Sequence, residues 1–161
     1  MGVKMDYISN LRKHIGTQPI IMCGANVILI NEKNEILLHH RTDRDWWGLP
    51  GGAMELGESL EDTARREVLE EINIECLELE LFNVYSGKDL YYKYPDGNEV
   101  FNVTVTYLCK TFKGELKVEK TEGRDARFYN ILDIPQNIST TIRPILNEYI
   151  IRNQRYSSDQ A

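Results

Sequence analysis

The segment from Ser59 to Asn73 restricts the fold more than any other part of the sequence, because its residues predict a helix with two unlike faces. Ser59 and Asp62 have the spacing of a capping box, in which the two side chains satisfy free backbone N–H groups at the start of a helix. An apolar residue recurs at every fourth position, and these residues are Leu60, Ala64, Val68 and Ile72. A stripe with this period predicts a helix that packs one face against a hydrophobic core.

The rest of this helix is acidic. Eight carboxylates lie between residues 55 and 75, namely Glu55, Glu58, Glu61, Asp62, Glu67, Glu70, Glu71 and Glu75. A solvated helix surface explains a generic run of this kind. Glu67, Glu70 and Glu71, however, have the i, i+3, i+4 spacing that places like charges side by side, where they repel each other unless a cation neutralises them. Mg²⁺ and Mn²⁺ are the natural cations for clustered carboxylate oxygens.

The neighbouring residues indicate the same chemistry. Arg66 directly precedes Glu67 and lies four residues before Glu70, so it is placed to hold a nearby carboxylate in one orientation. The segment Pro50–Gly52 predicts a tight loop, whose bare glycine backbone allows a ligand to approach closely. This combination favours a diphosphate bridged by metal ions, because the ions screen its charge and polarise phosphorus.

The spacing Gly52-x5-Glu58-x7-Arg66-Glu67-Val68-x-Glu70-Glu71-x-Asn73-Ile74 resembles the Nudix box, G-x5-E-x7-R-E-U-x-E-E-x-G-U, where U is a bulky aliphatic residue. Eight of the nine specified positions match over 23 residues. The one departure is Asn73 in place of glycine, and asparagine is the second-best residue for a left-handed helix end. The chain is thus similar to the Nudix (MutT-like) hydrolases. The resemblance implies an α/β fold of their type, an α/β/α sandwich with a mixed central sheet.

The resemblance also implies roles for individual residues. Metal ligands would be Glu67, Glu70, Glu71, the Gly51 carbonyl and Glu58, and the implied cofactor is Mg²⁺, with Mn²⁺ as the alternative. The catalytic residues would be Glu70, Glu71, Arg66 and Glu67, with Arg66 orienting a glutamate.

The general base would come either from the box glutamates or from an acidic residue of a downstream loop. Glu119, Glu122 and Asp125 lie in such a loop, and Glu122 and Asp125 are the candidates. An ordinary solvated loop carboxylate is the simpler interpretation of each.

The implied reaction is metal-dependent hydrolysis of a pyrophosphate bond in a nucleoside diphosphate linked to another group, by attack of water on phosphorus. Nucleoside triphosphates, dinucleoside polyphosphates, ADP-ribose and nucleotide sugars are the substrate classes. Family members that hydrolyse ADP-ribose tend to carry a proline downstream of the box, where this chain has Asp89. Those that hydrolyse dinucleoside polyphosphates tend to carry a tyrosine slightly farther on, where Tyr91 and Tyr92 lie. That difference favours the dinucleoside group slightly, although ordinary strand tyrosines explain these residues as well.

Candidate substrate contacts are Arg41, Arg44, Trp47 and Tyr91. The arginines are suited to phosphate or ribose oxygens, and Trp47 or its neighbour Trp46 to stacking on a base. Solvated surface arginines are an equally simple interpretation, and packing of one tryptophan against the sheet is the simpler interpretation for that pair.

Strands and two further helices are predicted around this segment. The helices are expected at residues 6–15 and 142–150, and the strands at 20–30, 35–41, 46–49, 77–86, 100–110 and 126–131. The first two strands flank turn residues and are expected to form a hairpin, and the apolar first strand is expected to be buried on both faces. A turn is expected at 94–98. The predicted organisation is an N-terminal helix at 1–16, a hydrolase domain at 17–153 and a flexible tail at 154–161.

Charge and hydropathy limit the expected partners. The net charge of −6 disfavours a nucleic-acid polymer and leaves a small nucleotide as the expected partner. No apolar run is long enough to cross a bilayer, so we expect a cytoplasmic protein without membrane contact. A homodimer that packs through the N-terminal helix is a further expectation.

Two other functions stay open. A non-catalytic Nudix-like module that senses a nucleotide would share the scaffold, but it is favoured by loss of box carboxylates, and none is lost here. An isomerase of isoprenyl diphosphates would need a catalytic cysteine near the start of the core. Cys23 lies there in an apolar run, where a buried structural thiol is expected. Cys76 and Cys109 are distant in sequence, so neither a disulfide framework nor a zinc site is predicted.

Overall fold

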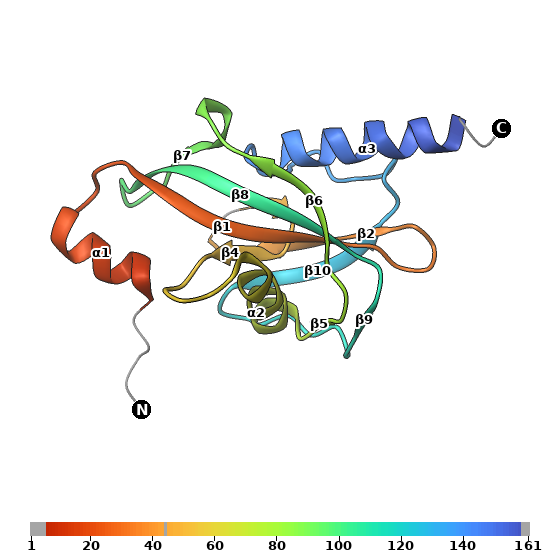
Figure 1. Ribbon diagram of the computed structural model, residues 1–161, viewed down its shortest axis with the longest axis horizontal. Coiled ribbons are helices and arrows are strands. Elements are labelled where there is room, and N and C mark those ends of the chain that lie inside the picture. Colours follow the sequence, from red (N-terminus) through yellow and green to blue (C-terminus); the bar gives the residue numbers. More distant parts are fainter. Residues whose placement is uncertain (1–5, 44, 159–161) are drawn as a thin grey trace.

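The computed structural model describes residues 6–43 and 45–158, which form layers of helix and sheet (Figure 1). The elements follow in the order α1 (Tyr7–Ile15), β1 (Ile20–Leu29), β2 (Ile36–Arg41), β3 (Trp47–Gly48), β4 (Gly51–Ala53), α2 (Leu60–Ile72), β5 (Glu75–Cys76), β6 (Glu80–Tyr85), η1 (Lys88–Leu90), β7 (Tyr91–Lys93), β8 (Glu99–Cys109), β9 (Phe112–Lys113), β10 (Gly123–Tyr129) and α3 (Arg143–Ser158). Every predicted helix and strand is present. The short strands β4, β5, β7 and β9 were not predicted.

The larger sheet has the order β4-β1-β8-β6, with β7 also paired to β8. β1 runs parallel to β8 over its whole length, from Ile20 opposite Val100 to Leu29 opposite Cys109, and β4 pairs antiparallel along its other edge. The predicted hairpin of β1 with β2 is therefore wrong. Both edges of β1 are taken by other strands, and within the described residues a single bridge, Ile30 to Ile36, joins it to β2. β2 instead lies between β10 and β3 in a second sheet.

The glycine segment before α2 is also different from its prediction. Gly51, Gly52 and Ala53 form strand β4, opposite Asn26, Ala25 and Gly24 of β1. Small residues on both strands allow this close pairing, since a Cβ at Gly51 would overlap the Ala25 backbone. The segment that begins the box is thus held in the sheet.

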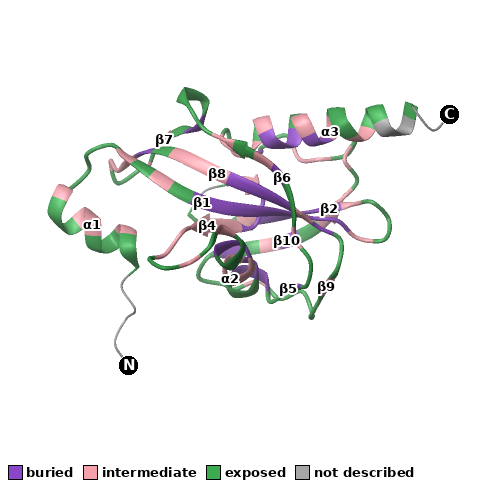
Figure 2. Cartoon of the chain, in the orientation of Figure 1, coloured by how far each residue is buried: buried purple, intermediate pink, exposed green. Residues whose placement is uncertain are grey.

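Two hydrophobic clusters lie on opposite faces of the sheets, as an α/β/α sandwich requires. Odd-numbered residues of β1 and β8 pack against Ala64, Val68 and Ile72 of α2. Even-numbered residues pack on the other side, where α3 contributes Ile145, Leu146 and Tyr149. Figures 1 and 2 show the two helices on either side of the buried centre of the strands. The predicted α/β fold with a mixed sheet is confirmed.

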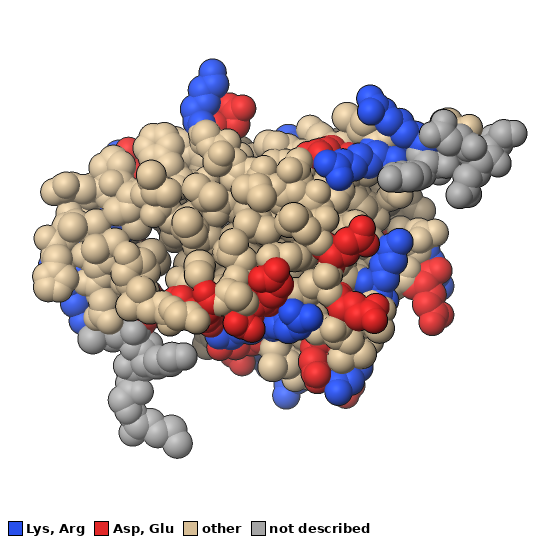
Figure 3. Space-filling model, viewed as in Figure 1, with Lys and Arg blue, Asp and Glu red and all other residues tan. Residues whose placement is uncertain are grey.

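The first half of β1 is not buried on both faces, contrary to the prediction. α2 covers the residues from Ala25 onward, whereas Ile21 is 75% exposed and Cys23 is exposed. The expected buried thiol at Cys23 is therefore wrong, because the helix does not reach that end of the sheet. Phe101 and Tyr91 lie beside Ile21 on the same uncovered face, and Figure 3 shows few charged side chains there, in contrast to the surface over α2.

The helices at the two ends of the chain differ in how they are held. α1, which the structure describes completely, has no buried side chain, and Arg12 fastens it by donating to the Glu99 backbone oxygen at 2.8 Å. α3 continues to Ser158, so residues 154–158 of the tail that was predicted to be flexible are helical, and residues 159–161 lie outside the described range. An ion pair between Glu148 and Arg152, one turn apart, supports the longer helix. Among the described residues, no helix has the length and hydropathy needed to span a bilayer.

Candidate active site

Local sequence fixes both ends of α2. Ser59 and Asp62 form the reciprocal capping box that was predicted. Asn73 ends the helix with φ 59° and ψ 30°, in the left-handed region, so its interpretation as a helix stop is confirmed. Its side-chain nitrogen also donates to the Glu115 backbone oxygen at 2.9 Å, which ties the loop before β10 to the end of the helix.

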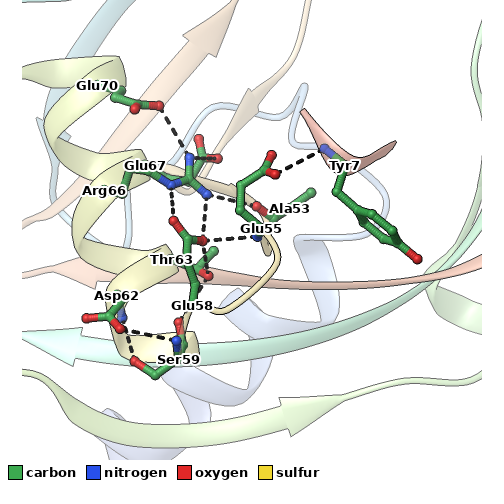
Figure 4. Close-up of polar contacts among 10 residues, drawn as sticks. All are labelled: Tyr7, Ala53, Glu55, Glu58, Ser59, Asp62, Thr63, Arg66, Glu67 and Glu70. Carbon is green, nitrogen blue, oxygen red and sulfur yellow. Dashed lines mark hydrogen bonds and ion pairs between the residues drawn. The ribbon is translucent and has the colours of Figure 1, made fainter. Parts of the chain in front are cut away.

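Arg66 is the centre of the polar contacts on this helix (Figure 4). Its Nε and Nη2 atoms bind the two Glu58 oxygens at 2.5 and 3.0 Å, and Nη1 lies 2.7 Å from Glu67 and 3.3 Å from Glu70. Nη2 also donates to the Ala53 backbone oxygen at 3.0 Å, which links the helix to β4. The hydrogen bond from Arg66 lowers the pKa of Glu58 to about 2, and the same bond raises the pKa of Arg66. The pair of Arg66 and Glu58 is therefore charged throughout the physiological pH range.

The three clustered glutamates lie at very different depths. The side chain of Glu70 is 57% exposed, that of Glu67 is 16% exposed and that of Glu71 is 2% exposed. Burial raises the pKa of Glu67 to about 7, although Arg66 opposes the shift. The Glu67 carboxylate packs directly on Gly52, where an added Cβ would lie 2.5–2.7 Å from its atoms. The glycine of the box therefore makes room for the glutamate of the box.

Glu71 has a neighbour that the sequence did not reveal. His39, on β2, places Nδ1 2.8 Å from Glu71 Oε2, and both side chains are almost completely buried. The contact lacks the alignment of a hydrogen bond. Among the described residues, Glu71 Oε2 therefore has no hydrogen-bond partner, and the other ring nitrogen of His39, Nε2, has none either. Two buried polar atoms in this condition cost free energy, roughly 1–3 kcal/mol each.

A cavity of about 750 Å³ extends from the three glutamates across the sheet. Glu67, Glu70 and Glu71 contribute to its lining. Its polar, uncharged wall contains Asn26, Asn102, Thr104, Ser139 and Thr141, and its aromatic wall contains Trp46, Trp47, Tyr92 and Tyr94. Thr106 fixes the Asn26 side chain through a buried hydrogen bond of 2.7 Å. The cavity lining thus combines clustered carboxylates with aromatic and amide side chains.

The predicted substrate contacts are only partly placed at this cavity. Arg41 and Trp47 line it, with Arg41 paired to Asp43 at 3.0 Å and Trp47 stacked on His40 with ring centroids 4.8 Å apart. Tyr91 does not line it, because strand residues alternate in direction and its hydroxyl donates to Glu99. The structure thus places Tyr91 away from the cavity, which its neighbour Tyr92 lines instead. Arg44 lies outside the described residues.

The structure places the two candidate general bases, Glu122 and Asp125, differently. Glu122 lines the cavity, and burial together with nearby Glu71 raises its pKa. Asp125 does not line the cavity and pairs with Arg127 at 2.5 Å. The loop that carries Glu122 is held against the end of α2, where the Glu119 backbone N–H donates to the Glu71 backbone oxygen at 2.9 Å.

Comparison with known proteins agrees with this arrangement. The sequence profile of the NUDIX domain matches residues 22–149, which is most of the chain. The chain belongs to the Nudix family.

Relatives within this family differ in the substrates that their names give. A Bacillus subtilis (strain 168) protein provisionally named 8-oxo-dGTP diphosphatase is 39% identical over 83 residues, which cover 52% of this chain and 53% of that protein. An ADP-ribose pyrophosphatase of Methanocaldococcus jannaschii is 30% identical over 111 residues, which cover 67% of this chain and 62% of that protein. The chain thus spans less than two thirds of the length of these relatives.

A solved structure supports the fold over a longer stretch. The crystal structure of a MutT NUDIX hydrolase from Burkholderia pseudomallei has a TM-score of 0.68 and 28% sequence identity to this Nudix chain, covering 81% of it and 97% of that chain. The Nudix sandwich that the resemblance implied is therefore confirmed.

Proposed function

We propose that this Nudix chain hydrolyses a pyrophosphate bond in a nucleoside diphosphate derivative, with Mg²⁺ as cofactor and Mn²⁺ as a substitute. The observation that supports this most is that one cavity joins Glu67, Glu70 and Glu71 to a wall of aromatic and amide side chains. A nucleotide has the two matching parts, a charged phosphate chain and a flat base that stacks and forms hydrogen bonds.

The clustered carboxylates fit a hard divalent cation. Glu67, Glu70 and Glu71 offer oxygen donors, and Glu71 Oε2 is buried without a hydrogen-bond partner among the described residues. The Gly51 backbone and Glu58 lie in the segments beside them, and we retain both as proposed ligands. Within residues 6–43 and 45–158, no three acidic, histidine or cysteine side chains already converge as a metal site, and Arg66 holds Glu67 and Glu70. A bound ion would therefore compete with Arg66 for these oxygens.

The side chains have distinct parts in the reaction. A metal ion held by Glu67, Glu70 and Glu71 would neutralise phosphate oxygens and polarise phosphorus. Arg66 keeps Glu58 and Glu67 in place, and Arg41 is positioned at the cavity for a phosphate oxygen. We assign Glu122 as the general base, because it lines the cavity and a raised pKa suits a group that accepts the proton of the attacking water. Asp125 is set aside for this role.

The first experiment is a substrate panel. Nucleoside triphosphates, including 8-oxo-dGTP, ADP-ribose, dinucleoside polyphosphates and nucleotide sugars are incubated with Mg²⁺, and the products are separated. We expect cleavage between phosphates of at least one class, strong loss of turnover in Glu71→Gln, and reduced kcat with little change in KM in Glu122→Gln. Glu75→Gln is the matched control, because Glu75 is an exposed carboxylate next to the box that pairs with Lys113.

The same panel tests the non-catalytic alternative. A nucleotide-sensing module would bind one of these compounds in calorimetry without converting it. No turnover of any class, or equal turnover by Glu71→Gln and the parent, would contradict the hydrolase proposal.

The oligomeric state is a separate proposal. α1 buries none of its described side chains within the chain, which supports the prediction that it packs on a second copy. Light scattering of the full chain and of a chain that begins at Thr17 tests this, and a monomer in both cases would contradict it.

A further inference from the structure

His39 occupies a place that alternation along β2 determines. Leu37 belongs to the cluster under α2 and Leu38 to the cluster under α3, so His39 again faces α2. There its ring lies between two groups, the Glu71 carboxylate and the backbone of Gly123. His40, the next residue, points to the other face and pairs with Asp45.

The imidazole ring of His39 packs against Gly123 without free space between them. A Cβ at Gly123 would overlap His39 Nε2, so the ring packs directly on the glycine. Gly123 is the first residue of β10 and follows Glu122, which lines the cavity. A single ring therefore separates the carboxylate of Glu71 from the backbone that carries Glu122.

Stability does not explain a histidine at this position. Its contact with Glu71 is close but leaves a buried polar atom unsatisfied on each partner. An apolar side chain of similar volume would fill the same space without a second buried polar atom. A costly polar residue next to a functional carboxylate indicates that its geometry serves the function.

We propose that His39 is a positioning residue that sets the orientation of the Glu71 carboxylate and its separation from the backbone of Glu122. This proposal rests on the proposed function, in which Glu71 binds the metal ion. The ring contacts Oε2 and is clamped by Gly123, so the carboxylate cannot turn toward β2. Groups that orient a metal-binding side chain in this way typically change metal affinity or activity by about 10–100-fold when they are replaced.

The test measures Mn²⁺ binding to the full chain by electron paramagnetic resonance, without substrate. We expect His39→Ala and His39→Leu to weaken Mn²⁺ binding by about 10-fold or more. His39→Gln is expected to keep most of the affinity, because its amide reaches the same carboxylate. His40→Ala is the matched control on the opposite face of β2, and its Mn²⁺ affinity is expected to equal that of the parent. Circular dichroism and urea denaturation establish that each variant folds.

The His39→Leu variant, which conserves the side-chain volume, distinguishes a positioning role of His39 from a packing role. If His39 only fills space, His39→Leu binds Mn²⁺ like the parent, and the proposal is overturned. Gly123→Ala provides a second route, since its methyl group pushes the ring from the other side. We expect it to weaken Mn²⁺ binding more in the parent than in the His39→Ala background, where only Val118 Cγ1, at 2.7 Å, still crowds the methyl group. Equal effects in both backgrounds would contradict the proposal.

Failure of the proposed function gives a different result. If the parent binds no Mn²⁺, or Glu71→Gln binds it as well as the parent, the metal assignment itself is wrong and the role of His39 falls with it. If the parent binds Mn²⁺ through Glu71 and the His39 variants also bind normally, only the present inference is wrong.

Discussion

A glycine is needed at position 52 because the Glu67 carboxylate packs directly on it and leaves no room for a Cβ atom. In Gly52→Ala the added methyl group would lie 2.5–2.7 Å from the Glu67 carboxylate atoms and must displace them. Displacements of about 1 Å in a catalytic group cost on the order of 100-fold in rate, so we expect kcat/KM to fall by about that factor. Steady-state kinetics with the best substrate of the panel measures this loss.

The matched control for this prediction is Gly87→Ala. Gly87 has a φ of 95° with open space around its Cβ position and does not line the cavity. Its replacement is expected to lower stability through backbone strain and to leave kcat/KM unchanged. Equal losses of activity in the two variants would show that strain, and not the Glu67 contact, explains the result.

Asn73 combines two stabilising effects at one position. Asn73→Ala is expected to lower the free energy of unfolding by about 1–2 kcal/mol, because alanine tolerates the left-handed conformation poorly and cannot bind the Glu115 oxygen. Asn73→Gly restores the family residue and relieves the strain but still loses the bond to Glu115. We therefore expect urea denaturation to rank the parent above Asn73→Gly, and Asn73→Gly above Asn73→Ala. A glycine variant more stable than the parent would contradict a role for the side-chain bond.

Sequence spacing predicted residues within the box better than residues outside it. Arg66 contacts the carboxylates that its spacing indicated, because i, i+4 neighbours meet on any helix. His39 had no such signal, since its partner Glu71 is on a different element and alternation along a largely buried strand does not show which face meets the site. Tyr91 and Tyr92 are adjacent, and only the register of β7 with β8 decides which one turns to the cavity.

At the level of elements, Glu148 fastens α3 to β6. Its carboxylate accepts bonds from Tyr85 at 2.6 Å and from Asn83 at 3.0 and 3.1 Å, and it pairs with Arg152. Burial alone would raise the pKa of Glu148, but these donors outweigh it and the pKa is lowered. This contribution to stability is therefore present above the ordinary pKa of a glutamate and is lost as the pH falls through the lowered value.

We expect Glu148→Gln to reduce the free energy of unfolding at neutral pH by about 2 kcal/mol. Since the variant cannot titrate at this position, its stability should fall less steeply in acid than that of the parent. Urea denaturation across the acidic range measures both effects. Glu80→Gln, an exposed carboxylate on β6, is the control, and an equal loss in that variant would contradict the role of Glu148.

The sequence predicted the helices and strands more reliably than it predicted which strands pair with each other. Period and capping identified α2, β8 and α3, because these signals are local. The pairing of β1 was not local: turn residues after it suggested a hairpin, whereas strands far along the chain take both of its edges. β4 was predicted as a loop because glycine disfavours strands in general, although close packing against β1 requires it here.

For the molecule as a whole, a rise in pH and the binding of a metal ion are expected to have opposite effects on the free energy of unfolding. Burial raises the pKa of Glu67 to about 7, so without metal the folded chain binds its proton more tightly than the unfolded chain does. The free energy of unfolding should therefore decrease as the pH rises from about 5 to about 8. Metal binding requires the ionised carboxylate, so stabilisation by Mg²⁺ should increase over the same interval.

Thermal denaturation with a chelator or with Mg²⁺, at both ends of this pH range, tests the prediction. The Glu67→Gln variant is the control and should show a weaker dependence on both pH and Mg²⁺. A chelated parent that becomes more stable with rising pH would contradict the assignment.

The parallel pairing of β1 with β8 also has a consequence for how the chain is made. The two strands meet at Asn26 and Thr106, which are separated by 80 residues in sequence. During synthesis, the apolar strand β1 is made before its partner β8 and stays unpaired with it until β8 has been translated. The acidic helix α2, which lies between them in the sequence, is complete by then. Pairing across so long a separation in sequence is slow, so β1 has an unpaired, aggregation-prone edge in the nascent chain during this interval. Chaperone dependence and aggregation during expression should therefore be governed by β1.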